Sequence, residues 1–167
     1  MTPVAEVLRR AGVSRETFYE HFSNKQDCFL AAYDASASTL LAAMKGAVRS
    51  GSEADSIAEK LERLLARYLE VLANEPAMAR TFLVEVYAAG PAALARRVQV
   101  QTRFVDTFAE IVGARDGHER FACEALVAAI SALVTQRVCA GQCAEVEELH
   151  APLVRFAREA LRGVSLR

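Results

Sequence analysis

Apolar residues recur at spacings of three and four along the whole chain, and no segment shows the strict alternation of a half-buried strand. The pattern therefore predicts an all-α protein. Proline, glycine and capping residues divide it into helices, and Ser23 with Gln26 predicts a capping box at the start of the third. The expected spans are 2–10, 14–20, 23–50, 54–73, 76–90, 91–113, 119–140 and 145–162.

The first two spans are short and lie on either side of Gly12, which can adopt the left-handed conformation that a sharp turn between helices requires. Ser14 is expected to cap the second span. Phe18 and Phe22, four residues apart, are expected to point toward a common core. This is the pattern of a helix-turn-helix, whose second helix lies in the major groove of DNA with its first residues over the base edges.

Candidate DNA contacts gather at this second helix. Arg15 and Glu16 open it, where a guanidinium can pair with guanine and a carboxylate can accept a hydrogen bond from cytosine. Lys25 is an independent indication, because a cation in the first turn of the third span has the wrong sign for the helix dipole. A docked DNA phosphate would reverse that interaction. Tyr19 and His21 are also placed to contact the DNA backbone.

Residues 2–33 closely resemble the DNA-binding segment of the tetracycline-repressor (TetR) family of transcription regulators. The matching residues are Val7, Ala11, Gly12, Val13, Ser14, Thr17, Phe18, Tyr19, His21, Phe22 and Lys25. The resemblance implies a homodimer, a palindromic operator in double-stranded DNA, and a small-molecule effector that binds the body of the protein and releases the DNA. It also implies that Arg15 and Glu16 contact bases and that the phosphate contacts are made by Thr17, Tyr19, His21 and Lys25.

The resemblance divides the chain into a DNA-binding region, 1–33, and a helical effector-binding and dimerisation domain, 34–167. Two features depart from the family pattern. Family members begin with a helix that precedes the span starting at Thr2, and Leu8 stands where the family usually has a small residue. Either the natural start lies upstream, or this sequence is the ordered part of a longer one, or the chain is impaired in DNA binding.

The last two spans are apolar on more than one side, which indicates more than one packing partner. Hydrophobic residues make up 53% of the chain, above the usual share. We expect these helices to form a four-helix bundle with the same pair from a second subunit; the alternative is two core helices of a monomer. The predicted interface residues are Leu126, Ile130, Leu133, Leu149, Leu153 and Phe156.

An effector site is predicted where polar residues interrupt apolar stripes. Gln101 interrupts the stripe of the 91–113 span, and Glu85 interrupts a run of apolar residues before it. Ligand cavities are mostly apolar with a few orienting polar groups, although aromatic residues at helical spacing are also typical of an ordinary core. The candidates are Phe82, Glu85, Tyr87, Gln101, Phe104, Phe108 and Thr135. Their composition favours a small, uncharged, lipophilic effector.

The remaining features exclude other classes of function. The net charge of −1 predicts no strong general attraction to nucleic acid. We expect four reduced cysteines, a cytoplasmic protein without a signal peptide, and no membrane span. No phosphate loop or nucleophile motif indicates an enzyme, and no cofactor or metal is expected. The alternative function is a dimeric helical protein that binds a ligand or a partner but not DNA in this form.

Overall fold

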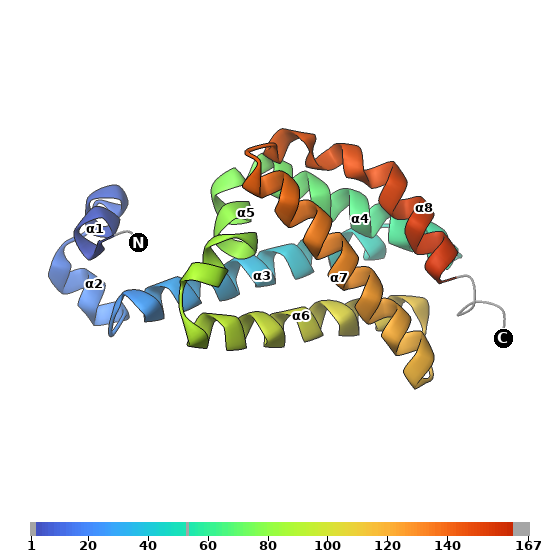
Figure 1. The fold of residues 1–167 in the computed structure, drawn as a ribbon, viewed down its shortest axis with the longest axis horizontal. Helices are drawn as coiled ribbons and strands as arrows, with labels where there is room; N and C mark the ends of the chain where they lie inside the picture. The colour runs from blue at the N-terminus through green and yellow to red at the C-terminus, as the bar shows by residue number, and fades with distance from the viewer. Residues whose placement is uncertain (1–2, 53, 162–167) are drawn as a thin grey trace.

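The computed structural model describes residues 3–52 and 54–161, and every regular element in this part of the chain is helical (Figure 1). The predicted all-α class is confirmed. The α-helices are α1 (Val4–Ala11), α2 (Arg15–His21), α3 (Lys25–Arg49), α4 (Ile57–Asn74), α5 (Pro76–Leu83), α6 (Pro91–Val112), α7 (Gly117–Cys139) and α8 (His150–Ala160). Two 3₁₀ segments accompany them, η1 (Glu85–Ala88) and η2 (Cys143–Leu149).

Capping groups place two helix starts later than expected. The N-cap of α3 is Asn24 and not Ser23, because the Asn24 side chain accepts a hydrogen bond from the Asp27 N–H at 2.9 Å. The Asp27 carboxylate in turn accepts from the Ser23 N–H at 3.0 Å. For α4, Ser56 and Glu59 form a reciprocal capping box, so that the helix begins at Ile57 and not near residue 54.

Two of the expected helices are each divided into an α-helix and a 3₁₀ segment. The span 76–90 comprises α5 and η1, and the span 145–162 comprises η2 and α8, its last residue lying outside the described part. Pro152 accounts for the second division. In a helix beginning at residue 145 its ring would clash in the interior, whereas it is the third residue of α8, where a missing N–H has no consequence.

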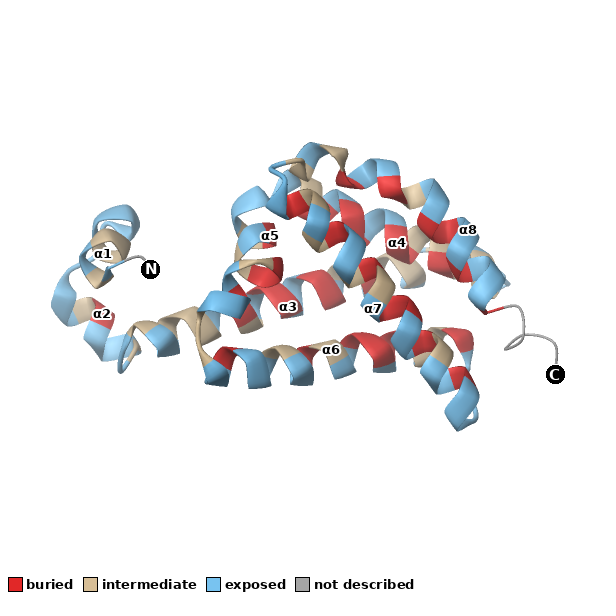
Figure 2. Cartoon of the chain, in the orientation of Figure 1, coloured by how far each residue is buried: buried red, intermediate tan, exposed pale blue. Residues whose placement is uncertain are grey.

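Helices α3 to α8 form the body, and α1 and α2 form a small head at one end of α3 (Figure 1). The core residues lie almost entirely in the body, where α3 packs on α4, α4 on α8 and η2, and α6 on α7 (Figure 2). The expected boundary at residue 33 falls inside α3, at the buried Tyr33. Head and body are therefore joined by one continuous helix and not by a flexible linker.

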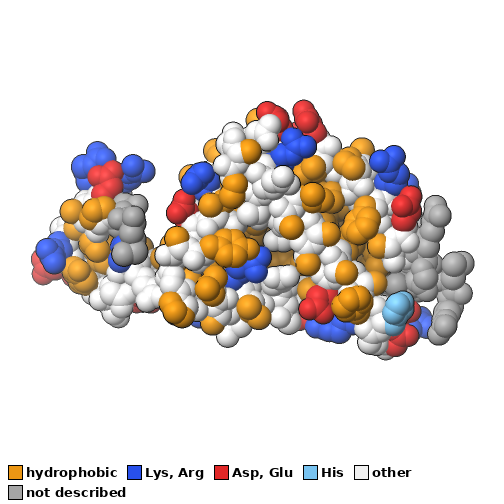
Figure 3. Space-filling model, viewed as in Figure 1, with side chains coloured by type: hydrophobic (Ala, Val, Ile, Leu, Met, Phe, Trp, Pro, Cys, Tyr) orange, Lys and Arg blue, Asp and Glu red, His pale blue; other side chains and the backbone are white. Residues whose placement is uncertain are grey.

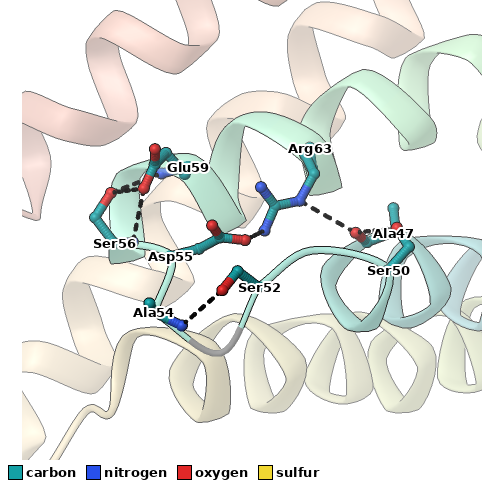
Figure 4. Close-up of polar contacts among 8 residues, drawn as sticks. All are labelled: Ala47, Ser50, Ser52, Ala54, Asp55, Ser56, Glu59 and Arg63. Atoms are coloured by element: carbon teal, nitrogen blue, oxygen red, sulfur yellow. Dashed lines mark hydrogen bonds and ion pairs between the residues drawn. The ribbon is translucent and has the colours of Figure 1, made fainter.

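The turn between α3 and α4 is held by the side chain of Arg63 (Figure 4). Its Nη2 donates to the Asp55 carboxylate at 2.5 Å, and its Nε donates to the Ala47 carbonyl at 3.3 Å. Gly51 lies against the same guanidinium, which any Cβ at this position would overlap. These contacts fix the end of α3 to the start of α4, so the helix that carries the head is anchored at its far end.

Candidate nucleic-acid interface and ligand cavity

The α1–α2 turn has the predicted geometry. Gly12 ends α1 in the left-handed conformation, with φ of 67°. Ser14 is extended, and its hydroxyl oxygen accepts a hydrogen bond from the Thr17 N–H at 3.0 Å. This bond satisfies one of the free donors at the start of α2. The turn is therefore built from local interactions that the sequence itself encodes.

The head has a very small core. Phe18 is 4% exposed and is the one buried residue in α1 and α2. Its ring centroid lies 5.4 Å from that of Phe22 and 5.3 Å from that of Tyr19. Packing of α1 against α2 thus depends mainly on one aromatic side chain and the partly buried residues around it.

The start of α2 is open to solvent. Arg15, Glu16 and His21 are exposed, as is Tyr19, while Thr17 is half-buried. The Arg15 guanidinium lies over the Tyr19 ring at 5.6 Å. A cation at the first position of a helix is unfavourable for the helix dipole, so Arg15 is placed poorly for stability and well for contact with an anionic or acceptor-rich partner. Lys25, half-buried, occupies the equivalent first position of α3.

The arginines of α1 are engaged within the head. Glu6 accepts from Arg9 Nη2 at 2.6 Å and from Arg10 Nε at 2.7 Å. These bonds lower the pKa of the Glu6 carboxyl to about 2 and raise the pKa of Arg9. Through residue 33 the sequence has four basic side chains, Arg9, Arg10, Arg15 and Lys25, against four carboxylates, Glu6, Glu16, Glu20 and Asp27. General attraction of the head to DNA is therefore weak, and Glu6 offsets part of it directly.

Replacing Glu6 by glutamine is expected to strengthen binding to any DNA sequence by about 2- to 10-fold at low salt, because two guanidinium groups lose their carboxylate partner. The logarithm of the affinity should also fall more steeply with the logarithm of the salt concentration. Fluorescence anisotropy of labelled duplexes across a salt series measures both. Glu148→Gln, an exposed change in the body, is the control. Equal affinity and an equal salt slope for Glu6→Gln would place α1 away from the duplex.

A cavity of about 50 Å³ lies inside the body. Four of the predicted effector residues line it: Phe82, Gln101, Phe104 and Phe108. The other lining residues, which sequence reasoning missed, are Tyr33, Met44, Leu65, Tyr68, Leu83, Arg97, Val100, Val127, Ile130 and Ser131. Of these, Arg97 stands four residues before Gln101 on the same helical stripe, and that spacing could have revealed it.

Three predicted effector residues do not line the cavity. Glu85 is exposed and accepts a hydrogen bond from Arg80 at 3.0 Å. Tyr87 is also exposed, and the guanidinium of Arg97 lies 4.9 Å from the centroid of its ring. Thr135 is half-buried further along α7. The run of apolar residues around Glu85 bends into η1 after α5, which turns this carboxylate outward.

The cavity wall is mainly aromatic. The ring of Phe82 lies 5.2 Å from that of Tyr33 and 5.8 Å from that of Phe104, and Tyr68 packs edge-on against Phe104 at 6.2 Å. Burial raises the pKa of Tyr33 to about 12, with Arg97 opposing the shift, and burial also raises the pKa of Tyr68. Both phenols are therefore neutral at physiological pH and can donate a hydrogen bond.

One contact connects the cavity region to the head. The Gln26 side chain, in the first turn of α3, donates to the Ala89 carbonyl at 3.2 Å. Ala89 directly follows η1, which carries Tyr87 and its contact with Arg97. A displacement of η1 or of the start of α6 would thus be transmitted to the helix that carries the head.

The predicted interface residues fall into two groups. Leu126, Ile130, Leu149 and Leu153 are buried within the protomer, where Ile130 lines the cavity, so they cannot offer surface to a partner. This part of the prediction is corrected: α7 and α8 turn these residues toward α4, α5 and α6. Leu133 and Phe156 are exposed, at 42% and 45%.

Further exposed apolar residues accompany Leu133 and Phe156, and together they make up what we call the outer face. It consists of Phe121, Ala125, Ala128, Ala132 and Leu133 on α7 and Phe156 on α8. Hydrophobic side chains gather over α7 in this view (Figure 3). By length and composition α7 could also cross a membrane. Only 33% of its most apolar 18-residue stretch is buried in the protomer. The helix thus has apolar surface beyond the part that the body covers.

One histidine and one buried carboxylate of the body make hydrogen-bond contacts with its backbone. His150 Nε2 lies 3.1 Å from the Glu62 carbonyl, and Glu119 accepts a hydrogen bond from the Arg115 N–H. Within the described residues no group of three potential ligands is placed to hold a metal ion.

An exposed helix-turn-helix on an all-helical body that contains a cavity is the architecture of a DNA-binding transcription regulator. Residues 1–32 match the family model of the bacterial regulatory proteins, tetR family. The match covers α1, α2 and the first turns of α3, so the head of this chain is similar to the corresponding region of the tetR-family regulatory proteins. The search of curated proteins and the search of solved structures each found no match.

Proposed function

We propose that the protein is a repressor that binds a palindromic operator as a homodimer and is released from it by a small lipophilic effector. The observation that carries the DNA-binding part is the placement of Arg15 and Glu16. They are the first two residues of α2, both are exposed, and the Gly12 turn holds α2 at the tip of the molecule (Figure 1).

In the proposed complex the start of α2 enters the major groove. Arg15 leaves the Tyr19 ring and donates two hydrogen bonds to a guanine, and Glu16 accepts from a cytosine amino group. The phosphate contacts are assigned to Thr17, Tyr19, His21 and Lys25, which lie on α2 and at the start of α3. Because the head has as many carboxylates as basic groups, base contacts supply a large share of the discrimination between operator and other DNA.

The outer face supports a homodimer. A second copy packed against Phe121, Leu133 and Phe156 would form the predicted bundle from two pairs of α7 and α8. A lipid environment fits this face less well, because Glu124 is exposed on the same helix and would enter the hydrocarbon layer. Two-fold symmetry would present two heads to two half-sites, which accounts for a palindromic operator. A protein that represses chromosomal genes in this way would act in the cytoplasm.

The cavity supports an effector. It is lined by residues of α3 to α7, and the contact of Arg97 with Tyr87 of η1 connects it to Ala89, which accepts a hydrogen bond from Gln26 on α3. A ligand that enlarges the cavity would move α6 and η1, and with them the angle at which α3 holds the head. Two heads moved in this way no longer match two half-sites, and the DNA is released.

Replacing Arg15 by alanine tests the DNA-binding part. We expect a loss of about 1–3 kcal/mol on the preferred operator, or about 5- to 150-fold in affinity, and a relaxed preference at the base pair that Arg15 reads. Anisotropy measurements compare a duplex from the protein's own promoter region with single-base variants of it. Arg103→Ala, an exposed change in the body, is the matched control.

An unchanged affinity together with an unchanged base preference would remove Arg15 from the interface. If the wild-type chain also failed to bind any duplex from its promoter region at low salt, the second candidate function would replace the first. That candidate is a dimeric helical protein that binds a ligand or a partner without DNA, and the formal neutrality of the head is the observation that favours it.

A further inference from the structure

We propose that the cavity binds an apolar carboxylic acid, whose carboxylate pairs with Arg97. The inference deepens the proposed effector function, on which its regulatory consequence depends. It replaces the uncharged effector that the composition favoured. The argument starts from the charge of Arg97, which is half-buried on α6 and lines a cavity that is otherwise mainly aromatic and aliphatic.

Arg97 has no acidic partner in the described part of the chain. No carboxylate oxygen there lies within 4 Å of its guanidinium, whereas its neighbour Arg96 pairs with Asp34 at 3.7 Å. The other half-buried arginines in the described part of the body do have acidic partners, Arg63 with Asp55 and Arg137 with Glu145. An unpaired guanidinium at the wall of an apolar cavity is unfavourable unless an anion reaches it.

Neutral groups hold Arg97 in position without neutralising it. Its Nη1 donates to the Gln101 side-chain oxygen at 3.1 Å, and its guanidinium lies over the Tyr87 ring at 4.9 Å. A guanidinium has five N–H donors, so further donors are left for a bidentate carboxylate. Basic surface among apolar side chains is visible between α5 and α6 (Figure 3). The site is thus charged at one end and apolar behind it.

The rest of the cavity fits the apolar part of such an acid. Phe82 and Phe104 provide ring faces, and the neutral phenol of Tyr33 can donate a hydrogen bond to a carboxylate oxygen. The cavity, of about 50 Å³, has little spare room for a phenyl or hexyl group, so we expect binding to shift lining side chains. Because Arg97 lies near the start of α6 and contacts Tyr87 of η1, the displacement begins at the elements that meet Gln26.

The test uses isothermal titration calorimetry on the full chain with phenylacetate and hexanoate, and with the neutral amides of the same acids. We expect each acid to bind at least about tenfold more tightly than its amide. Arg97→Gln should abolish this preference, and Arg97→Lys, which keeps the charge but not the bidentate geometry, should reduce it. The matched control is Arg96→Gln, one residue away and already paired with Asp34, which should retain it.

Equal binding of acids and amides, an acid preference that survives Arg97→Gln, or no binding of either acid at millimolar concentration would each overturn the proposal. Circular dichroism melting checks that both Arg97 variants fold. If Arg97→Gln does not fold, the acid preference is tested with Arg97→Lys alone. Acid binding is measured without DNA and should persist in Arg15→Ala. Failure of the acid site and failure of the DNA-binding function are therefore distinguishable.

Discussion

Phe18→Ala is expected to eliminate operator binding while the body of the protein still melts at its normal temperature. Removing a buried phenylalanine costs about 3–5 kcal/mol, and Phe18 is the one buried residue of α1 and α2. The head makes few other contacts that could compensate for this loss. Amide hydrogen exchange over residues 4–22 should show loss of protection there, and anisotropy should show no specific complex.

The reciprocal variant is Leu61→Ala, a large-to-small change at a buried residue of α4 that does not line the cavity. It should lower the melting temperature of the whole chain but leave operator affinity unchanged at temperatures where the protein is folded. The double comparison separates damage to the head from damage to the fold. Wild-type operator affinity in Phe18→Ala would show that α2 is not held against DNA by the packing described here.

Phe156→Glu is expected to convert the proposed homodimer into monomers. Phe156 is exposed on α8 beside α7, and a charge placed there would be desolvated in the predicted bundle without a partner. Sedimentation velocity should show a single species of about half the wild-type mass. Operator affinity should fall by about 10²- to 10⁴-fold, because each head then binds its half-site independently.

Leu153→Glu would not test the interface. Leu153 is 2% exposed, so a buried charge would unfold the protomer whatever its oligomeric state. Leu94→Glu is the suitable control, since Leu94 is an exposed apolar residue on α6, away from the outer face. A dimer that survives Phe156→Glu but not Leu94→Glu would move the interface from α7 and α8 to α6.

The sequence by itself determined the elements whose signals are local. Gly12 and Ser14 predicted the turn of the head, because a left-handed residue and a hydroxyl cap act within a few residues of the chain. Pro76 and Pro91 marked the first residues of α5 and α6 for the same reason. Residues 1–33 also contained enough motif positions to indicate the family before any packing was known.

Only the tertiary structure decided which residues share the cavity. Phe104 and Phe108 were predicted because they lie in the same span as Gln101, but Tyr33 and Tyr68 come from α3 and α4. Nothing in a sequence pattern states which distant helices meet. Only the structure could identify Arg97 as a candidate for binding an anion, because no carboxylate oxygen of the described residues lies within 4 Å of its guanidinium.

The tertiary structure also decided which side of α7 faces inward. This helix is apolar around most of its circumference, so its periodicity could not distinguish Leu126 and Ile130, which are buried, from Leu133, which is exposed. A hydrophobic pattern indicates that a side chain is buried away from water. It does not indicate whether the same chain or another surface covers that side chain, because transfer of the side chain from water to either environment gives a similar free energy.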